Sequence, residues 1–595
     1  MVRKKITQGL NSFARWRFRH IGNNTFLIVA AMIVGVITSL LAVLLKIAVT
    51  EVHEWVKYGI FLNDVEWMYL FYPLLGILIC TFYVQIFLHG DLGRGTGLVL
   101  LNISRKNSNV ERHKLYSQLV SSVLTVGFGG SAGLEAPIVV TGSAYGSAIG
   151  NTFRMTYREK TLLIACGSAA GISAIFNCPI AGVIFAMEVI LARAAVTAFI
   201  PILIASATSA VVSKILFSGQ PFFRIVDDWN LTSLPYFVIL GLICGLLSVY
   251  NIKAYSKGEE IFSKIKNPYV ASLICGGALG ILVFIFPSLY GEGYNIVTGL
   301  FHGDFLHLMD QSPLSNLFNG PWSLVIIGTI LMMGKVFATS FTIGGGGNGG
   351  MFGSSLYAGA FLGLIFTQIL RLTGVQDLNT VQFIAVAMAG LLSGVIHAPL
   401  TAIFLIAEIT GGYALFVPLM IVAALSYFVS RYFEPYSIYT RKLAQKGLLA
   451  VDDPDREVLY QMRLSSIVET DFATIPLNGK LDDLINQIPT SKRHVYPVVD
   501  AIGLLHGIIL LDDVKQILFK REEYTVIRIQ DIMSRPPAIL DVHEDMSKVM
   551  KIFEDTGAWN LPVTDQGKYI GFVSKSNIFT KYRRQLIRDL QREEL

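Results

Sequence analysis

Long apolar segments separated by short polar breaks run through most of the chain. The segments 26–45, 236–247 and 323–334 consist almost entirely of hydrophobic and small residues. Segments of about 20 residues have the length of a helix that crosses a bilayer, whereas shorter ones broken by glycine are typical of helices that tilt, stop halfway or re-enter. The pattern predicts an all-α, polytopic membrane domain over residues 26–445.

The pattern changes near residue 445, where charged residues become frequent and apolar runs become short. The stretches 494–517 and 560–579 share one plan: a strand, an acidic turn, a second strand and a helix. A repeated unit of about 50 to 60 residues indicates paired α+β modules that share one core. The predicted organisation is an N-terminal segment (1–25), the membrane domain (26–445), a linker (446–465), two modules (466–525 and 526–585) and a tail (586–595).

The membrane part contains an internal duplication. FNCPIAGVIFAMEV resembles VIHAPLTAIFLIAEIT, and Pro179 and Glu188 recur as Pro399 and Glu408 at a common offset of 220 residues. Duplication with glycine-broken helices is typical of transporter folds with inverted repeats, whose substrate sites lie near the membrane midplane. Because the two glutamates occupy the same point of the repeat, we expect them to have a structural role at a helix end.

Composition and charge agree with a membrane location. Of the 595 residues 15% are charged, against about 25% in soluble proteins. The first twenty residues are basic and contain no acid, which favours a cytoplasmic N-terminus and, beside a first membrane helix, disfavours a nucleic-acid-binding arm. The five cysteines lie in apolar segments without metal-ligand spacing, so we predict buried thiols and no metal site. We expect a multi-pass protein of a bacterial inner membrane, with the C-terminal modules in the cytoplasm.

Three glycine-rich stretches interrupt the apolar segments: GRGTG (93–97), GSAGLEAP (130–137) and GGGGNGGMFGSS (344–355). A helix that starts inside the membrane directs free N–H groups and the positive end of its dipole toward an anion. Three convergent helix starts could bind a small anion without a lysine or arginine, which would let the ion leave again. The alternative is that the glycines only permit close helix packing.

Glu135 lies within the second of these stretches. A carboxylate inside a membrane costs several kcal/mol, so such residues rarely occur without a function. At the mouth of an anion site, an ionised carboxylate would mimic the permeant anion and block its path. Protonation, or displacement by anions, would move the carboxylate away and link transport to pH.

These residues resemble the CLC family of chloride channels and chloride/proton antiporters, including its paired C-terminal CBS domains. GLEAP resembles the family's G(K/R)EGP motif and makes Glu135 the gating glutamate. The segment KVFATSFTIGGGGNGGMFGSSL resembles the one that holds the GxFxP motif. The resemblance implies the CLC fold, a lipid-embedded homodimer with one pathway per subunit, chloride as the bound ion, no required cofactor and no enzyme activity. The anion-binding positions that it implies are Arg94, Gly95, Thr96, Leu134, Ala136, Gly350, Met351, Phe352 and Tyr436.

The chain departs from the family motifs at several of these positions. Where the family has GSGIP, this sequence has GRGTG, so Arg94 stands at the position of the anion-binding serine and Thr96 could supply a hydroxyl instead. The family's central tyrosine falls in EPYSIYTRKL, where Tyr436 is the preferred match and Tyr439 the alternative. Because anion selectivity in the family depends on the position of Arg94, nitrate or fluoride remain alternatives to chloride.

Most antiporters of the family carry a second glutamate at the inner proton entrance, where this chain has Val189. Without that acid, protons lack their usual route, so the sequence favours a chloride channel over an antiporter. The antiporter stays the alternative. A cation transporter with CBS domains is disfavoured because the membrane part offers few acids, and an enzyme because there is no nucleophile–base pair or complete P-loop.

CBS pairs of the family often bind adenine nucleotides through a hydroxyl residue and an aspartate three residues later. Here the first module has Asp513 but Leu510, and the second has Ser574 but Asn577. Each module therefore keeps half of the pattern. Nucleotide binding and a role as a scaffold for dimerisation and gating both stay open.

Overall fold

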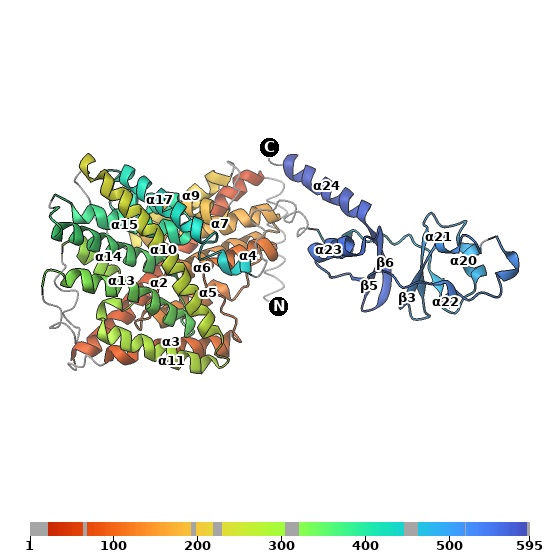
Figure 1. Cartoon of the computed structure of the whole chain (residues 1–595), viewed down its shortest axis with the longest axis horizontal. Helices are drawn as coiled ribbons and strands as arrows, with labels where there is room; N and C mark the ends of the chain where they lie inside the picture. The colour runs from red at the N-terminus through yellow and green to blue at the C-terminus, as the bar shows by residue number, and fades with distance from the viewer. Residues whose placement is uncertain are drawn as a thin grey trace. The chain divides into compact units, whose positions relative to one another are not determined.

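The computed structural model describes residues 22–62, 68–191, 198–217, 229–303, 320–375, 377–445, 462–517 and 519–591. The chain divides into two compact units, Met1–Leu449 and Ala450–Leu595 (Figure 1). In the described residues, helices build the first unit, and small sheets with helices build the second, which confirms the predicted fold class. Most of the predicted N-terminal segment and of the predicted linker lie outside the described residues, as does the end of the tail.

The first unit contains two successive sets of helices. The first set comprises α2 (Asn23–Leu62), α3 (Met68–Phe87), α4 (Gly97–Arg105), α5 (Lys114–Val126), α6 (Glu135–Thr152), α7 (Tyr157–Phe176), α8 (Pro179–Phe185), a π-helical turn (Ala186–Ile190) and α9 (Phe199–Leu216). The second comprises α10 (Leu234–Ser263), α11 (Pro268–Ile285), α12 (Tyr294–Phe301), α13 (Ser323–Gly344), α14 (Met351–Leu372), α15 (Thr380–Ile396), α16 (Pro399–Ile409) and α17 (Phe416–Phe433), followed by α18 (Arg441–Gln445).

The two sets pack in the same way. Helix α6 packs against α7 as α14 packs against α15, and α2 contacts α7 and α9 as α10 contacts α15 and α17. The corresponding helices α3 and α11 lie side by side (Figure 1). This helix-for-helix correspondence confirms the internal duplication.

The break between the paired helices is also the same in both repeats. Helix α7 ends at Asn177 (φ 56°) and α15 ends at His397 (φ 57°), and both residues have left-handed backbone conformation. Asn and His adopt this conformation more readily than most residues. Two residues later, Pro179 and Pro399 begin the next helix, where a missing N–H has no cost.

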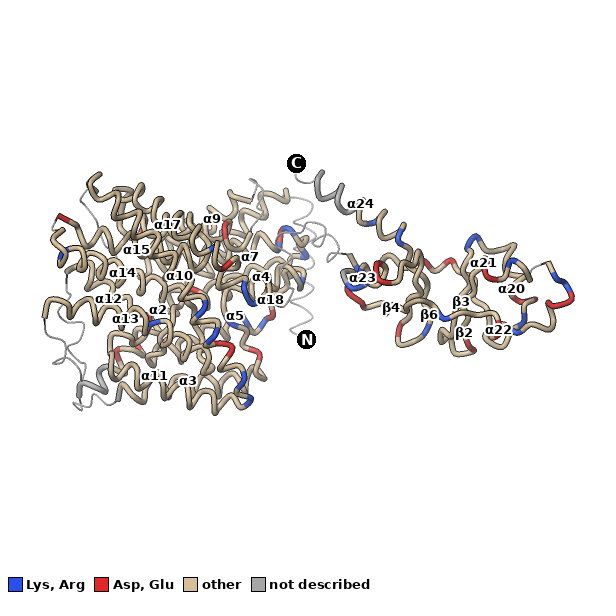
Figure 2. The backbone as a smooth tube through the Cα atoms, in the orientation of Figure 1, with Lys and Arg blue, Asp and Glu red and all other residues tan. Residues whose placement is uncertain are grey.

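The outer surface of this unit is suited to lipid. Nine of the described helices are long and apolar enough to span a membrane. Large apolar side chains on them remain exposed, among them Leu44 at 58%, Ile215 at 75% and Phe428 at 67%. In water a surface of this kind would be an aggregation hazard. Figure 2 shows that charged residues are sparse along the helices of this unit. The chain is an integral, multi-pass membrane protein.

The second unit consists of two similar modules. The first has β1 (Ile475–Pro476), β2 (Val495–Val499) and β3 (Leu505–Leu510), with α20 (Leu481–Gln487), α21 (Leu511–Val514) and α22 (Ile529–Ile532). The second has β4 (Leu540–Asp541), β5 (Asn560–Asp565) and β6 (Lys568–Ser574), with α23 (Met546–Thr556) and α24 (Lys575–Gln591).

Strand pairing follows the same plan in the two modules. Ile475 pairs with Val498 in parallel, and Leu540 pairs with Val563 in parallel, before an antiparallel hairpin in each. Both residues of the parallel pair in the second module lie 65 positions after the corresponding residues of the first module. The repeat is slightly longer than predicted because the short first strands carry too little hydrophobic pattern to be seen in the sequence.

Glycines bring the backbones of α6 and α7 into direct contact. A Cβ atom at Gly142 would overlap the carbonyl group of Gly167, and one at Gly167 would overlap the carbonyl group of Gly142. A Cβ at Gly146 would overlap the backbone of Leu163 in the same way. Close helix packing is therefore the role of these glycines, which lie outside the three glycine-rich stretches.

We expect Gly167→Val to destabilise the protein by about 3 kcal/mol or more, because two backbones would have to separate. The measurement is thermal unfolding and monodisperse yield in detergent. Gly277→Val is the matched control, because nothing lies within 4 Å of a Cβ atom at Gly277. Equal behaviour of the two variants would contradict the packing argument.

Candidate functional site

The loops before α6 and α14 are paired with each other through their backbones. The Gly133 N–H donates to the Gly350 carbonyl at 3.0 Å, and the Gly350 N–H donates to the Gly133 carbonyl at 2.9 Å. This two-bond bridge places the N-termini of the two helices next to each other. The sequence predicted that these loops converge, and the structure brings them together.

Arg94 joins the first glycine-rich loop to the third. Its two terminal nitrogens donate to the carbonyls of Ile343 at 3.0 Å and Gly346 at 2.8 Å. Ile343 lies in the last turn of α13, where a cation is favourable beside the negative end of the helix dipole. The guanidinium is therefore bound to backbone carbonyls of the third loop. Beside it, Gly95 (φ 77°) is open, because a Cβ atom there would meet nothing within 4 Å.

A buried polar stripe on α5 holds the first and third glycine-rich loops in place. Gln118 donates to the carbonyls of Leu92 at 3.0 Å and Gly93 at 2.8 Å, and its own Oε1 accepts from Asn348 at 2.9 Å. The Asn348 backbone N–H donates to Thr125 Oγ1 at 3.0 Å. The sequence analysis missed this stripe. The signal in the sequence is a set of polar residues at helical spacing, all of them fully buried in the structure, namely Ser117, Gln118, Ser121, Ser122 and Thr125.

Glu135 is the first residue of α6 and is 1% exposed. Its Oε1 accepts a hydrogen bond from the Tyr294 hydroxyl. The carboxylate also faces the backbone N–H groups of Glu135 itself and of Gly353. It thus lies across the starts of α6 and α14, where the dipoles of both helices favour negative charge.

The other predicted residues of these two helix starts are buried around this position. Leu134 and Ala136 flank Glu135 on α6, and Gly350, Met351 and Phe352 form the start of α14. The four of these residues that carry side chains are each 3% exposed or less. The Phe352 ring lies 5.6 Å from that of Phe176, between centroids. The packing fixes both helix starts in one orientation.

The two candidate tyrosines lie in different surroundings. Tyr436 is 45% exposed, whereas the Tyr439 hydroxyl interacts with the side chain of Thr96. The Tyr439 carbonyl oxygen also lies 2.7 Å from a Cβ atom built on Gly97. Of the two, Tyr439 and not the preferred match Tyr436 lies beside the predicted hydroxyl residue Thr96.

Glu188 and Glu408 cap each other's repeats. Glu188 accepts the backbone N–H groups of Leu400 at 3.2 Å and Thr401 at 2.8 Å, and also the Thr401 hydroxyl at 2.8 Å. Glu408 accepts those of Ile180 at 3.0 Å and Ala181 at 2.8 Å.

Each carboxylate therefore lies at the start of the short helix of the other repeat, α16 for Glu188 and α8 for Glu408. This agrees with the structural role at a helix end that the sequence predicts. The arrangement makes α8 and α16 antiparallel, which is the relation of inverted repeats. Val189, next to Glu188 in the π-helical turn, is half-buried and packs against the hydrophobic core.

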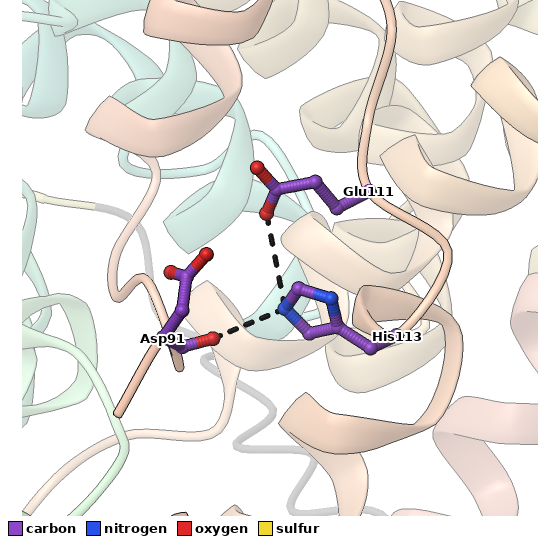
Figure 3. Close-up of side chains that lie close together, drawn as sticks. All are labelled: Asp91, Glu111 and His113. Carbon is purple, nitrogen blue, oxygen red and sulfur yellow. Dashed lines mark hydrogen bonds and ion pairs between the residues drawn. The ribbon is translucent and has the colours of Figure 1, made fainter. Parts of the chain in front are cut away.

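A cluster of metal-ligand residue types lies at the entry to the first glycine-rich loop. Figure 3 shows Asp91, Glu111 and His113 close together. Lys114 Nζ lies 3.4 Å from Asp91 Oδ1 and 3.5 Å from Glu111 Oε2, and Lys106 pairs with Glu111 at 2.6 Å. Two ammonium groups already balance these carboxylates, so the cluster is explained as an ion-pair network.

In the second unit, the nucleotide-pattern residues Ser574 and Asn577 make hydrogen bonds to the segment around Ile467 and Glu469. Ser574 Oγ donates to Glu469 Oε1 at 2.8 Å, and the Asn577 side-chain amide donates to the Ile467 carbonyl at 2.8 Å. A ribose at this position would have to displace the Ser574–Glu469 bond. Asp513, in the other module, is exposed on α21.

Comparison with known proteins identifies the fold and its family. The family model described as voltage gated chloride channel matches residues 76–431, and a CBS domain model matches residues 529–584. The chain therefore belongs to the voltage-gated chloride channel (CLC) family. Members of this family are channels or transporters rather than enzymes.

Relatives include both classes of CLC protein. Chloride channel protein CLC-e of Arabidopsis thaliana is 24% identical over 85% of this chain and 79% of its own length. The H(+)/Cl(-) exchange transporter ClcA of Vibrio cholerae is 27% identical over 50% of this chain and 62% of its own length.

Two solved structures share the fold. The structure of a slow cyanobacterial Cl-/H+ antiporter aligns with 72% of this chain and with 99% of its own length, at TM-score 0.61 and 22% identity. A eukaryotic CLC transporter covers 93% of this chain with 97% of its own, at TM-score 0.58 and 19% identity.

We expect Glu188→Gln and Glu408→Gln each to lower the stability of the membrane unit by about 2 kcal/mol, because an amide nitrogen would face backbone N–H donors. The loss of stability should be larger for Glu188→Gln, because the Glu188 carboxylate also accepts a hydrogen bond from the Thr401 hydroxyl. Thermal unfolding in detergent measures the effect. Unchanged stability with altered ion flux would instead show that these acids act in transport.

Proposed function

We propose that this protein conducts chloride across a membrane as a CLC channel gated by Glu135. The observation that supports the proposal most strongly is the position of the Glu135 carboxylate across the N-termini of α6 and α14. A carboxylate bound there occupies a place suited to a small anion. Its departure would leave the backbone N–H groups free to bind the permeant ion.

The anion site proposed here consists of backbone groups from the paired loops together with two hydroxyls. Gly350, Met351 and Phe352 supply the start of α14, and Thr96 with Tyr439 supplies the hydroxyl side. Arg94 then acts as a clamp between loops, because its terminal nitrogens are engaged by carbonyls. A site of this kind holds an anion without a salt bridge, as conduction requires.

Val189 favours the channel over the antiporter, since a valine cannot deliver protons from the inner side. The second candidate is a chloride/proton antiporter, favoured by the relative from Vibrio cholerae, which is an H(+)/Cl(-) exchange transporter. We further propose a homodimer in lipid with the N-terminus and CBS unit in the cytoplasm, where the modules act as a scaffold or bind an adenine nucleotide.

The first test is chloride efflux from liposomes that contain purified protein, with external pH recorded under an imposed chloride gradient. Efflux that requires a potassium shunt and moves no protons supports the channel. Uphill proton movement driven by chloride supports the antiporter. No chloride movement of either kind contradicts the proposal and directs the test to nitrate and fluoride.

For the gate, Glu135→Gln should keep chloride flux open and make it independent of pH. In the unmodified protein, flux controlled by one titrating carboxylate falls by about tenfold per pH unit above its midpoint. The flux assay over acidic to neutral pH measures this. Flux of the Gln variant that stays as pH-sensitive as before would count against Glu135 as the gate.

For the loop clamp, Arg94→Ser should leave the order of anion preference unchanged and lower stability by about 2 kcal/mol, because the two hydrogen bonds of a charged group are lost. Tyr439→Phe is the comparison, since it removes a hydroxyl from the proposed site and should change the order. Competition of chloride flux by nitrate and fluoride gives the order. A changed order in Arg94→Ser would place its side chain in the anion path.

A further inference from the structure

A second carboxylate lies at the same helix start as the gate. Glu292 occupies a tight turn between Gly291 (φ 63°) and Gly293 (φ 88°), just before α12. Its carboxylate accepts a hydrogen bond from the backbone N–H of Leu134, the residue that precedes Glu135. The charge of Glu135 acts directly on Glu292. The two acids therefore share the N-terminus of α6.

The same turn also contacts the gate through a neutral side chain. Tyr294, two residues after Glu292, donates its hydroxyl to Glu135 Oε1. Its ring packs edge-on against Phe176 at 6.0 Å between centroids, which restrains its position. One short segment thus supplies a hydrogen-bond donor to the Glu135 carboxylate and a second negative charge beside it.

Two buried lysines complete the cluster. Lys335 on α13 is fully buried; its Nζ donates to the Gly291 carbonyl at 2.8 Å and lies 4.8 Å from the Tyr357 ring centroid. Lys46 on α2 donates to the carbonyls of Ala174, at 3.3 Å, and Ile175.

The charges of both lysines act on Glu292 and on Glu135. Among the described residues, neither ammonium forms a salt bridge with a carboxylate. In the part of the chain that the structure describes, the titratable groups around Glu292 are Glu135, Tyr294, Lys46 and Lys335, with Tyr357 beyond Lys335, Cys178 near Lys46 and His53 of α2 beside Gly291.

The net charge of this buried cluster depends on the ionisation of both carboxylates. With both ionised, two negative and two positive charges offset each other in a buried site. Two neighbouring carboxylates also disfavour each other's ionised form, so the state of one depends on the state of the other. Neutralising Glu292 would leave two lysines facing the Glu135 carboxylate alone and would hold it in place more firmly.

We propose that Glu292 sets the pH at which Glu135 releases the anion pathway. This inference rests on the proposed function, because it requires that Glu135 gates flux. Glu292 is a positioning residue rather than part of the anion site. It acts on the gate through charge at the start of α6, and Tyr294 provides the accompanying hydrogen bond.

The test is chloride flux against pH for Glu292→Gln in liposomes. Removing the neighbouring negative charge favours the ionised, closed form of Glu135, so a lower pH is needed to open the pathway. We expect the midpoint of the flux–pH curve to move down by on the order of one pH unit. Glu292→Asp, which keeps the charge, should stay closer to the unmodified protein and serves if the Gln variant does not fold. An unchanged midpoint in a folded Gln variant would overturn the inference.

Two further variants separate this inference from the proposal about Glu135. Glu260→Gln removes an exposed acid that pairs with Lys264 on α10 and should leave the midpoint unchanged. In Glu135→Gln/Glu292→Gln, flux should be as pH-independent as in Glu135→Gln alone. If Glu135→Gln is pH-independent but Glu292→Gln keeps the normal midpoint, only the role of Glu292 is wrong. If Glu135→Gln stays pH-sensitive, the gate itself is wrong.

Discussion

Backbone N–H groups at helix starts inside a membrane protein must find partners within the protein itself, and the rest of this structure depends on how that is done. The starts of α6 and α14 are held together by the Gly133–Gly350 bridge, which uses some of these groups. The polar stripe of α5 and the Arg94 guanidinium satisfy carbonyls of the same loops. What remains is a small set of donors in a rigid frame, and the Glu135 carboxylate lies among them.

Rigidity of the frame matters because selectivity and release both depend on fixed, neutral donors. A lysine or arginine directed at the same point would bind an anion more tightly and slow its departure. The chain does contain such cations near these loops, but their ammonium or guanidinium groups are bound to carbonyls, as Lys335 and Arg94 show. Their charge acts at a distance, while the direct contacts come from backbone.

Much of the architecture could be predicted from the sequence, because long hydrophobic segments indicate a lipid environment and repeated motifs indicate the internal duplication. The roles of Glu188 and Glu408 followed from their equivalent positions. Other features could not be predicted, because they depend on contacts between distant segments. The position of Arg94 in a motif predicts an anion ligand, yet its side chain turns toward α13. Glu292 carries no motif at all, and only folding brings it to Leu134.

The exchange of carboxylate caps between α8 and α16 has a consequence for synthesis. The N–H groups of Ile180 and Ala181 lie some 228 and 227 residues ahead of the glutamate that binds them. At about 5 to 20 residues per second, translation needs roughly ten to fifty seconds to supply Glu408. Throughout that interval the first repeat is inserted with an unfinished helix start. The two repeats therefore mature together, and a nascent chain stopped between them would lack the carboxylate cap of α8.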